Sequence, residues 1–284
     1  MSVESPTTAQ NAEFDQVLKS IMLDKLRRDL PWYDASWLHR FLAAQQLVKQ
    51  HQPERLADFL QAFEPLQTPA DFAVRNVPDV FTETTLQDIR DTIAALPQSA
   101  YEGHEVGSFG RSVVHDHPFF TELQQSFVPL VSELAGEEVE PSYNFLSLYS
   151  RFGVCEPHID APWAKWTLDI CLDQSVEWPI HFSQIVPWPD SSHKSSESWK
   201  EQIKSAPDLS FSSHVLQPNQ AILFSGSSQW HYRDALPAQE ETGFCNLLFF
   251  HFIPKGTRDL IDPRNWAQLF DMPQLQGPPF DTKA

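Results

Sequence analysis

Glycine is unevenly distributed along this 284-residue chain, and the asymmetry is the strongest constraint on its fold. No glycine occurs before Gly103, and all nine glycines lie between Gly103 and Gly277. Glycine supplies the positive φ angles of tight turns and bulges, which short strands joined by loops need repeatedly. The distribution therefore predicts helices in the first third of the chain and strands in the later part.

Hydrophobic periodicity and capping residues predict where the helices lie. We expect them over residues 14–28, 37–50, 53–63, 85–96 and 119–135. Thr82 or Thr84 can cap the fourth helix, and Gly136 is suited to end the fifth. Residues 1–70 are expected to form an N-terminal helical extension, and a short apolar segment at 72–77 leads into the next domain.

After residue 140 the pattern becomes that of short strands. Six segments are rich in aromatic and aliphatic residues and are separated by Gly, Pro, Asn, Asp and Ser. They are residues 142–149, 166–172, 178–185, 213–216, 220–224 and 244–253. This pattern predicts an all-β sandwich or barrel within a domain of residues 71–284. The Ser-rich segment 187–208 is long for a hairpin, so it is either a lid over a barrel mouth or a surface insertion.

Charge and cysteine usage exclude several classes of protein. The chain has 20 Lys and Arg against 38 Asp and Glu, a formal net charge of −18, which disfavours binding to nucleic acid or an anionic membrane surface. The three cysteines, Cys155, Cys171 and Cys245, form no C-x-x-C pattern. The longest apolar stretch, 244–254, is interrupted by polar residues. We expect a cytoplasmic protein outside the membrane.

One segment has the spacing of a metal site. His158 and Asp160 alternate on an extended segment, so an imidazole and a carboxylate can face the same side. A third ligand, His231, follows the predicted strand 220–224 after a Gly-Ser loop. Two histidines and one carboxylate leave three coordination positions open on an ion, which is the arrangement of non-haem Fe(II) oxygenases.

At these residues the sequence resembles the Fe(II)/2-oxoglutarate-dependent dioxygenase superfamily, most closely its prolyl-hydroxylase-like branch. The resemblance covers about residues 72–254. It is carried by Tyr149 and Gly153, Pro157 before the His-x-Asp motif, Leu172-Asp173, Trp178-Pro-Ile-His-Phe182 and Phe224 before the second histidine. It implies a mainly β fold, the double-stranded β-helix (a jelly-roll or cupin-like barrel), preceded and flanked by α-helices.

The same resemblance implies a chemistry. His158, Asp160 and His231 would be the catalytic metal ligands, Fe(II) the cofactor and 2-oxoglutarate the cosubstrate. With O₂, such an enzyme hydroxylates or desaturates a C–H bond of a small-molecule or peptide substrate. Because Asp160 occupies the carboxylate position, we expect these reactions rather than halogenation.

The sequence departs from the family where a cation usually holds the far carboxylate of 2-oxoglutarate. No Lys or Arg lies at residues 240–246. Arg233 is the first candidate for this role, ahead of Arg151 and Lys165, although it can equally form a surface ion pair with Asp234 or Glu240. Neutral hydrogen bonds to the carboxylate can come from three further residues, Tyr149, Thr167 and Asn246. Asp169 is expected to pair with Lys165, or else to bind a cationic group of the substrate.

Two alternatives remain open at this stage. The missing cation permits a facial-triad Fe(II) oxidase or oxygenase that does not use 2-oxoglutarate. The chain can also be a non-catalytic barrel-fold binding protein, with a homodimer formed through its N-terminal helices.

Overall fold

A computed structural model describes residues 16–17, 35–188, 199–237 and 242–276. Packing divides the chain into two compact units. One unit comprises residues 1–67, 188–199 and 256–284, and the other comprises residues 68–187 and 200–255. The domain boundary expected at residue 70 stays a prediction. Among the described residues, no helix is long and apolar enough to span a membrane.

The first unit is helical and packs around aromatic rings. Its elements are α2 (Ala35–His51), η1 (Pro53–Arg55), α3 (Leu56–Ala62), η2 (Glu64–Leu66), α9 (Arg258–Ile261), η5 (Pro263–Asn265), α10 (Trp266–Leu269) and η6 (Pro273–Leu275). Trp37 stacks on Phe41 and donates a hydrogen bond to the carbonyl of Ile261 at 2.7 Å. The helices predicted at 37–50 and 53–63 are confirmed, whereas only residues 16 and 17 of the helix predicted at 14–28 are described.

The second unit contains two antiparallel sheets. The six-stranded sheet has the order β1-β8-β5-β10-β3-β2, and the four-stranded sheet has the order β4-β9-β6-β7. The strands are β1 (Arg75–Val77), β2 (Arg111–His115), β3 (Val139–Ser150), β4 (Cys155–His158), β5 (Trp166–Gln174), β6 (Ile180–Phe182), β7 (Ser212–His214), β8 (Gln220–Phe224), β9 (His231–Arg233) and β10 (Phe244–Pro254). The predicted mainly β architecture with helices is confirmed, and a closed barrel stays a prediction.

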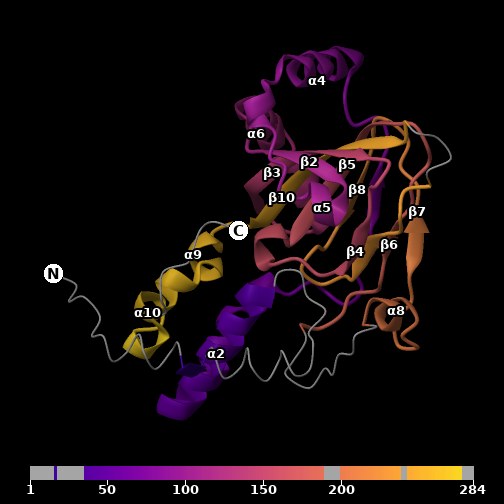
Figure 1. Cartoon of the computed structure of the whole chain (residues 1–284). Helices are drawn as coiled ribbons and strands as arrows, with labels where there is room; N and C mark the ends of the chain where they lie inside the picture. The colour runs from indigo at the N-terminus through magenta and orange to yellow at the C-terminus, as the bar shows by residue number, and fades with distance from the viewer. Residues whose placement is uncertain (1–15, 18–34, 189–198, 238–241, 277–284) are drawn as a thin grey trace. The chain divides into compact units, whose positions relative to one another are not determined.

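Helices cover one face of the six-stranded sheet. They are α4 (Glu83–Ala95), α6 (Pro118–Ser126) and α7 (Val128–Ala135). Four short helical segments lie elsewhere along the chain: η3 (Gln98–Ala100), α5 (Val106–Phe109), η4 (Pro162–Ala164) and α8 (Trp199–Lys204). In Figure 1, α4 and α6 lie on one side of β2, β3 and β10, while β4, β6 and β7 lie on the other. Thr82 caps α4 by accepting a hydrogen bond from the amide of Thr85, as predicted.

The single helix predicted at 119–135 is wrong, because the segment forms two helices that meet at Phe127. Pro129 lies in the first turn of α7, where its missing N–H is tolerated, so a new helix starts there. Gly136 ends α7 in the left-handed conformation, as expected.

Alternation along the strands separates two environments. On β5, Leu168 and Ile170 join the core beneath the helices, whereas Cys171 joins the core that also contains Phe182 of the four-stranded sheet. Thr167 and Asp169 share the face of Cys171, because side chains two residues apart lie on the same side of a strand. We call this face, between the two sheets, the inner face. It carries the candidate site.

Candidate metal centre

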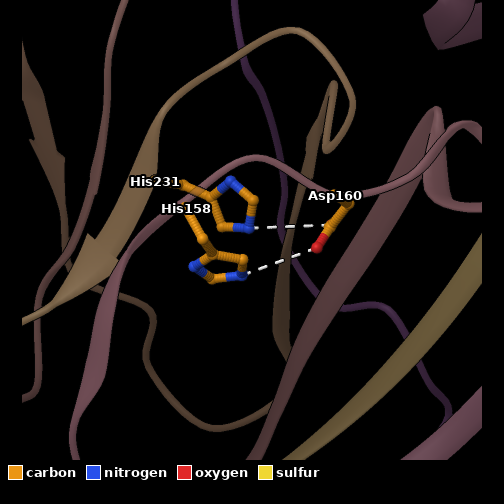
Figure 2. Close-up of side chains that lie close together, drawn as sticks. All are labelled: His158, Asp160 and His231. Carbon is orange, nitrogen blue, oxygen red and sulfur yellow. Dashed lines mark ion pairs between the residues drawn. The ribbon is translucent and has the colours of Figure 1, made fainter. Parts of the chain in front are cut away.

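Strand pairing brings the predicted metal ligands together. His158 ends β4, His231 begins β9, and the antiparallel register of these strands places the two residues opposite each other. Their ring centroids lie 4.1 Å apart. Asp160 follows β4, and its amide donates to the carbonyl of Gly226 at 2.8 Å. Figure 2 shows both rings facing the Asp160 carboxylate, with Nε2–O distances of 3.5 Å for His158 and 3.6 Å for His231.

The orientation of each imidazole ring is set by a backbone carbonyl. Nδ1 of His158 lies 2.8 Å from the carbonyl of Glu156, and Nδ1 of His231 lies 2.9 Å from that of Gln229. A carbonyl oxygen only accepts hydrogen bonds, so Nδ1 carries the proton and Nε2 of a neutral ring presents a lone pair. Both lone pairs then face a carboxylate. Such a group of acceptors is stable only with a proton or a cation between them.

Burial and the charges of the neighbouring groups determine which of the two imidazoles carries a second proton. Burial, helped by the neighbouring His158, holds the pKa of His231 well below its usual value. Burial also opposes charge on His158, but Cys155 and the Asp160 carboxylate outweigh it and raise the pKa of His158 to about 10. One proton therefore resides on His158, and His231 stays neutral. The ligand atoms of the three residues lie within 4.8 Å of one another, and the described residues contain no other such group that could hold a metal ion.

A glycine is required beside the carboxylate. A Cβ atom on Gly226 would lie 2.4 Å from Oδ2 of Asp160 and 2.5 Å from the carbonyl of Ala164. Gln229 fixes the same loop, because it accepts from the amide of Ser225 and donates to the carbonyl of Ser183. The loop between β8 and β9 is thus held closely against Asp160, which positions both Asp160 and His231.

Arg233 lies two residues after His231, but it is not at the surface. Its guanidinium is buried, donates to Asp169 at 2.7 Å and also donates to the carbonyl of Trp178. The predicted surface pair with Asp234 is therefore wrong, and Glu240 lies outside the described residues. The residue is buried because β9 directs it toward the inner face of β5, where Asp169 supplies the opposite charge.

The other two candidate cations are placed elsewhere. Lys165 pairs with Glu137 at 2.6 Å, so the predicted pairing of Lys165 with Asp169 is wrong. Arg151 is exposed and lies over the ring of Phe152. Neither residue joins the inner face beside Asp169.

A further arginine, which the sequence patterns did not indicate, lies beside Tyr149. Arg111 on β2 is opposite Tyr149 on β3, donates to the Tyr149 hydroxyl at 2.7 Å and forms an ion pair with Glu105. Burial raises the pKa of Tyr149, so its hydroxyl is neutral. The segment Arg-Ser-Val-Val-His does not alternate in polarity, so periodicity does not predict a strand there. In the structure Arg111 shares the face of Val113, two residues away on β2.

The remaining two candidates are on opposite faces of the sheet. Thr167 lies beside the group of His158, Asp160 and His231, which we call the metal group. A Cβ atom on Gly226 would lie 2.4 Å from Oδ2 of Asp160 and 3.1 Å from Oγ1 of Thr167. Its hydroxyl also hydrogen-bonds with Nδ1 of His251 at 3.0 Å. Asn246 lies on β10 between Cys245 and Leu247, which belong to the inner core. It therefore faces away from Tyr149 and Thr167.

No protein-family profile and no curated protein sequence matches the chain. Among solved structures, the non-haem α-ketoglutarate-dependent carbocyclase SnoK from nogalamycin biosynthesis matches with a TM-score of 0.50 and 12% identity, over 66% of this chain and 87% of that chain. The α-ketoglutarate-dependent epimerase SnoN from the same biosynthesis matches with a TM-score of 0.48 and 15% identity, over 72% of this chain and 84% of that chain.

HygX from Streptomyces hygroscopicus, solved with nickel, 2-oxoglutarate and hygromycin B bound, matches with a TM-score of 0.46 and 11% identity, over 69% of this chain and 86% of that chain. At such low identity a structural match shows a common fold and no more. The likeness to SnoK shows that this chain shares the mainly β fold of that carbocyclase.

Proposed function

We propose that this protein is a non-haem Fe(II)- and 2-oxoglutarate-dependent oxygenase that hydroxylates or desaturates a C–H bond of a small-molecule or peptide substrate. The observation that carries the proposal is the group of three acceptors, Nε2 of His158, Nε2 of His231 and the Asp160 carboxylate, facing one another. The fold shared with SnoK, which is α-ketoglutarate-dependent, adds support.

The donor set suits Fe(II), because two imidazoles and one carboxylate bind on one face and leave the opposite face open. The bound ion would supply redox chemistry and open positions for a keto acid and O₂. The protein supplies orientation: the carbonyls of Glu156 and Gln229 hold the two rings, and the loop at Gly226 holds Asp160. Such partners of ligating residues tune metal affinity.

The far carboxylate of 2-oxoglutarate would bind on the inner face near Arg233 and Tyr149. Arg233 has guanidinium N–H groups beyond those that contact Asp169 and Trp178, and the Tyr149 hydroxyl is held in place by Arg111. Thr167 lies at the metal end of the same face and can contact the keto acid there. Asn246 is excluded from the proposed site because it faces the opposite side of the sheet.

The strand order supports a double-stranded β-helix as the form of the fold. Strands β8, β5, β10 and β3 are adjacent in one sheet, and β4, β9, β6 and β7 form the other, which is the interleaving of a jelly roll. We place this oxygenase domain at residues 71–284, within the prolyl-hydroxylase-like branch, and the helical extension at residues 1–70.

The test is consumption of 2-oxoglutarate in air by the Fe(II)-loaded protein. His158→Ala should abolish it, whereas His214→Ala, which removes a histidine outside the metal group, should leave it intact. Unchanged consumption in His158→Ala would overturn the proposal. Failure of the natural protein to bind Fe(II) would instead favour a non-catalytic binding protein.

One observation favours a second candidate, a facial-triad oxidase that takes its electrons from the substrate. Arg233 is already paired with Asp169, and no lysine or arginine occurs on β10 among its described residues. If 2-oxoglutarate leaves the anaerobic Fe(II) spectrum unchanged while a substrate perturbs it, this second candidate is preferred.

A further inference from the structure

Two ion pairs lie on the inner face beyond the metal group, one buried and one partly buried. Arg233 on β9 pairs with Asp169 on β5, and Arg111 on β2 pairs with Glu105. Tyr149 connects the two pairs, because its hydroxyl accepts a hydrogen bond from Arg111 and its ring contacts that of Trp178, over which Arg233 lies. We call these five residues the double pair. Two positive and two negative side chains balance one another there, so the double pair is neutral before any ligand binds.

This balance has a consequence for a ligand with a second carboxylate. A carboxylate bound beside Arg233 would bring a third negative charge to two positive ones, in a place where the side chain of Arg233 is 4% exposed and that of Asp169 is 0% exposed. A buried charge without a counter-charge is costly, and a buried titratable group relieves the cost by becoming neutral.

We infer that Asp169 takes up one proton from solvent when the far carboxylate of 2-oxoglutarate binds beside Arg233. The inference rests on the proposed function and adds to it how the site compensates the charge of its cosubstrate. In the step, the Asp169 carboxylate becomes a carboxylic acid, and Arg233 exchanges a protein carboxylate for that of the ligand. Asp169 acts through Arg233 and is thus a positioning residue.

Asp169 is better suited than Glu105 to accept this proton. Oδ1 of Asp169 is buried and has no hydrogen-bond partner among the described residues, so it offers an unused position for the proton. Burial also raises the pKa of Asp169, against the opposing effect of Arg233 and Arg111. Glu105, by contrast, is 14% exposed and contacts Arg111 rather than Arg233.

The other titratable groups around Asp169 are expected to keep their protonation states during this step. Burial raises the pKa of Tyr149 on β3, and a hydrogen bond with Cys245 together with burial raises that of Cys171 on β5, so both remain neutral near pH 7. Cys155 on β4 lies opposite Arg233 and contacts His158. Loading the metal before the keto acid is added keeps that contact the same in every measurement.

The experiment is calorimetric titration of the Mn(II)-loaded protein with two keto acids of equal chain length. 2-Oxoglutarate has the far carboxylate, and 2-oxopentanoate lacks it. Each is titrated in two buffers that differ in heat of ionisation, which gives the number of protons taken up per ligand. We expect about one proton with 2-oxoglutarate and none with 2-oxopentanoate, and an affinity for 2-oxoglutarate that falls about tenfold for each pH unit of increase.

Two variants locate the proton. Asp169→Asn keeps an acceptor for Arg233 but cannot titrate, so proton uptake and the pH dependence of affinity should both disappear. Glu105→Gln is the matched control and should retain the uptake. The inference is overturned if both keto acids take up equal numbers of protons, or if uptake persists in Asp169→Asn. Should that variant fail to fold, the two keto acids still decide the question in the natural protein.

The outcomes also separate this inference from the proposed function. If 2-oxoglutarate does not bind to the metal-loaded protein, the proposed function fails, and the inference fails with it. If 2-oxoglutarate binds without proton uptake, only the inference fails.

Discussion

Two aspartates on either side of the start of β5 are held in opposite ways. Asp160 faces two imidazole nitrogens at 3.5 Å and 3.6 Å, in a group that contains only acceptors once the rings are neutral. Asp169 is fully buried and accepts a hydrogen bond from Arg233 at 2.7 Å, so its negative charge is paired with a positive charge inside the protein. The counter-charge of Asp160 in the metal-free protein is thus a protonated imidazole at 3.5 Å, a longer contact than that of Asp169 with its guanidinium at 2.7 Å.

The contrast separates binding from stability. A buried pair such as Arg233–Asp169 is costly to break, because the remaining partner becomes an unpaired buried charge. The group at Asp160 is expected to contribute less to stability, because its side chain is partly exposed and its contacts with the two imidazoles are longer. Ligand binding is therefore expected at Asp160, where the charge is less closely paired than at Asp169.

The largest effect on stability should follow from breaking the Arg233–Asp169 pair. Arg233→Met leaves Asp169 buried without a cation, and we expect the free energy of unfolding of the metal-free protein to fall by about 3–5 kcal/mol. Urea unfolding followed by circular dichroism measures this. Replacing both partners, as Arg233→Met with Asp169→Leu, should recover much of the loss, because no unpaired charge then remains.

Asp160, in the metal group, provides the matched control. Asp160→Asn in the metal-free protein should lower the free energy of unfolding by less than Arg233→Met does, because Asp160 is partly exposed and its contacts with the two imidazoles, at 3.5 Å and 3.6 Å, are longer than the 2.7 Å contact of Asp169. A cost for Asp160→Asn equal to that for Arg233→Met would show that the two aspartates do not differ as described.

A smaller effect, confined to metal binding, is expected at the loop that supports Asp160. In Gly226→Ala the added methyl group would meet Oδ2 of Asp160 and the carbonyl of Ala164, so the carboxylate must move. We expect affinity for Mn(II) to fall about 10- to 100-fold, as when residues that orient ligands are altered. Gly243→Ala, where the nearest side-chain atom is 3.0 Å away on Leu236, serves as the control. Equal affinities for the two variants would contradict the role given to Gly226.

The metal group could be predicted from sequence because its signals are local. His158 and Asp160 are two residues apart, and the strand before His231 is apolar and ends in a Gly-Ser loop. The segment predicted at 220–224 coincides with β8. Short-range alternation and turn residues carry this information, so neither long-range contacts nor the fold were needed to find it.

The double pair could not be predicted because its contacts join distant segments. Asp169 and Arg233 have several possible partners of opposite charge nearby in sequence, and only the packing of β9 in the four-stranded sheet against β5 in the six-stranded sheet selects one. Arg111 was missed because β2 was not predicted as a strand. The break between α6 and α7 was missed although Pro129 marks it, since the apolar pattern continues across it.

A third prediction concerns His251, a neutral group on the inner face that belongs to neither the metal group nor the double pair. Burial lowers its pKa from 6.5 to about 3, so it stays neutral in the folded protein. Between these values the unfolded chain binds a proton that the folded protein does not, and stability must fall as the pH decreases from about 6.5 toward 3. The slope from this one group is at most about 1.4 kcal/mol per pH unit.

Because other groups also titrate in this range, the test compares variants rather than absolute slopes. His251→Phe retains an aromatic ring beside Tyr143, with which His251 stacks at 4.1 Å, and removes the titration. Urea unfolding of the metal-free protein at several pH values should therefore give a shallower loss of stability for His251→Phe than for the natural protein. His104→Phe is the control, since it makes the same substitution at a half-exposed histidine near Glu102 and Glu105. Parallel curves for His251→Phe and the natural protein would mean that the interior admits a charged His251, and the inner face would then be less shielded than the double pair requires.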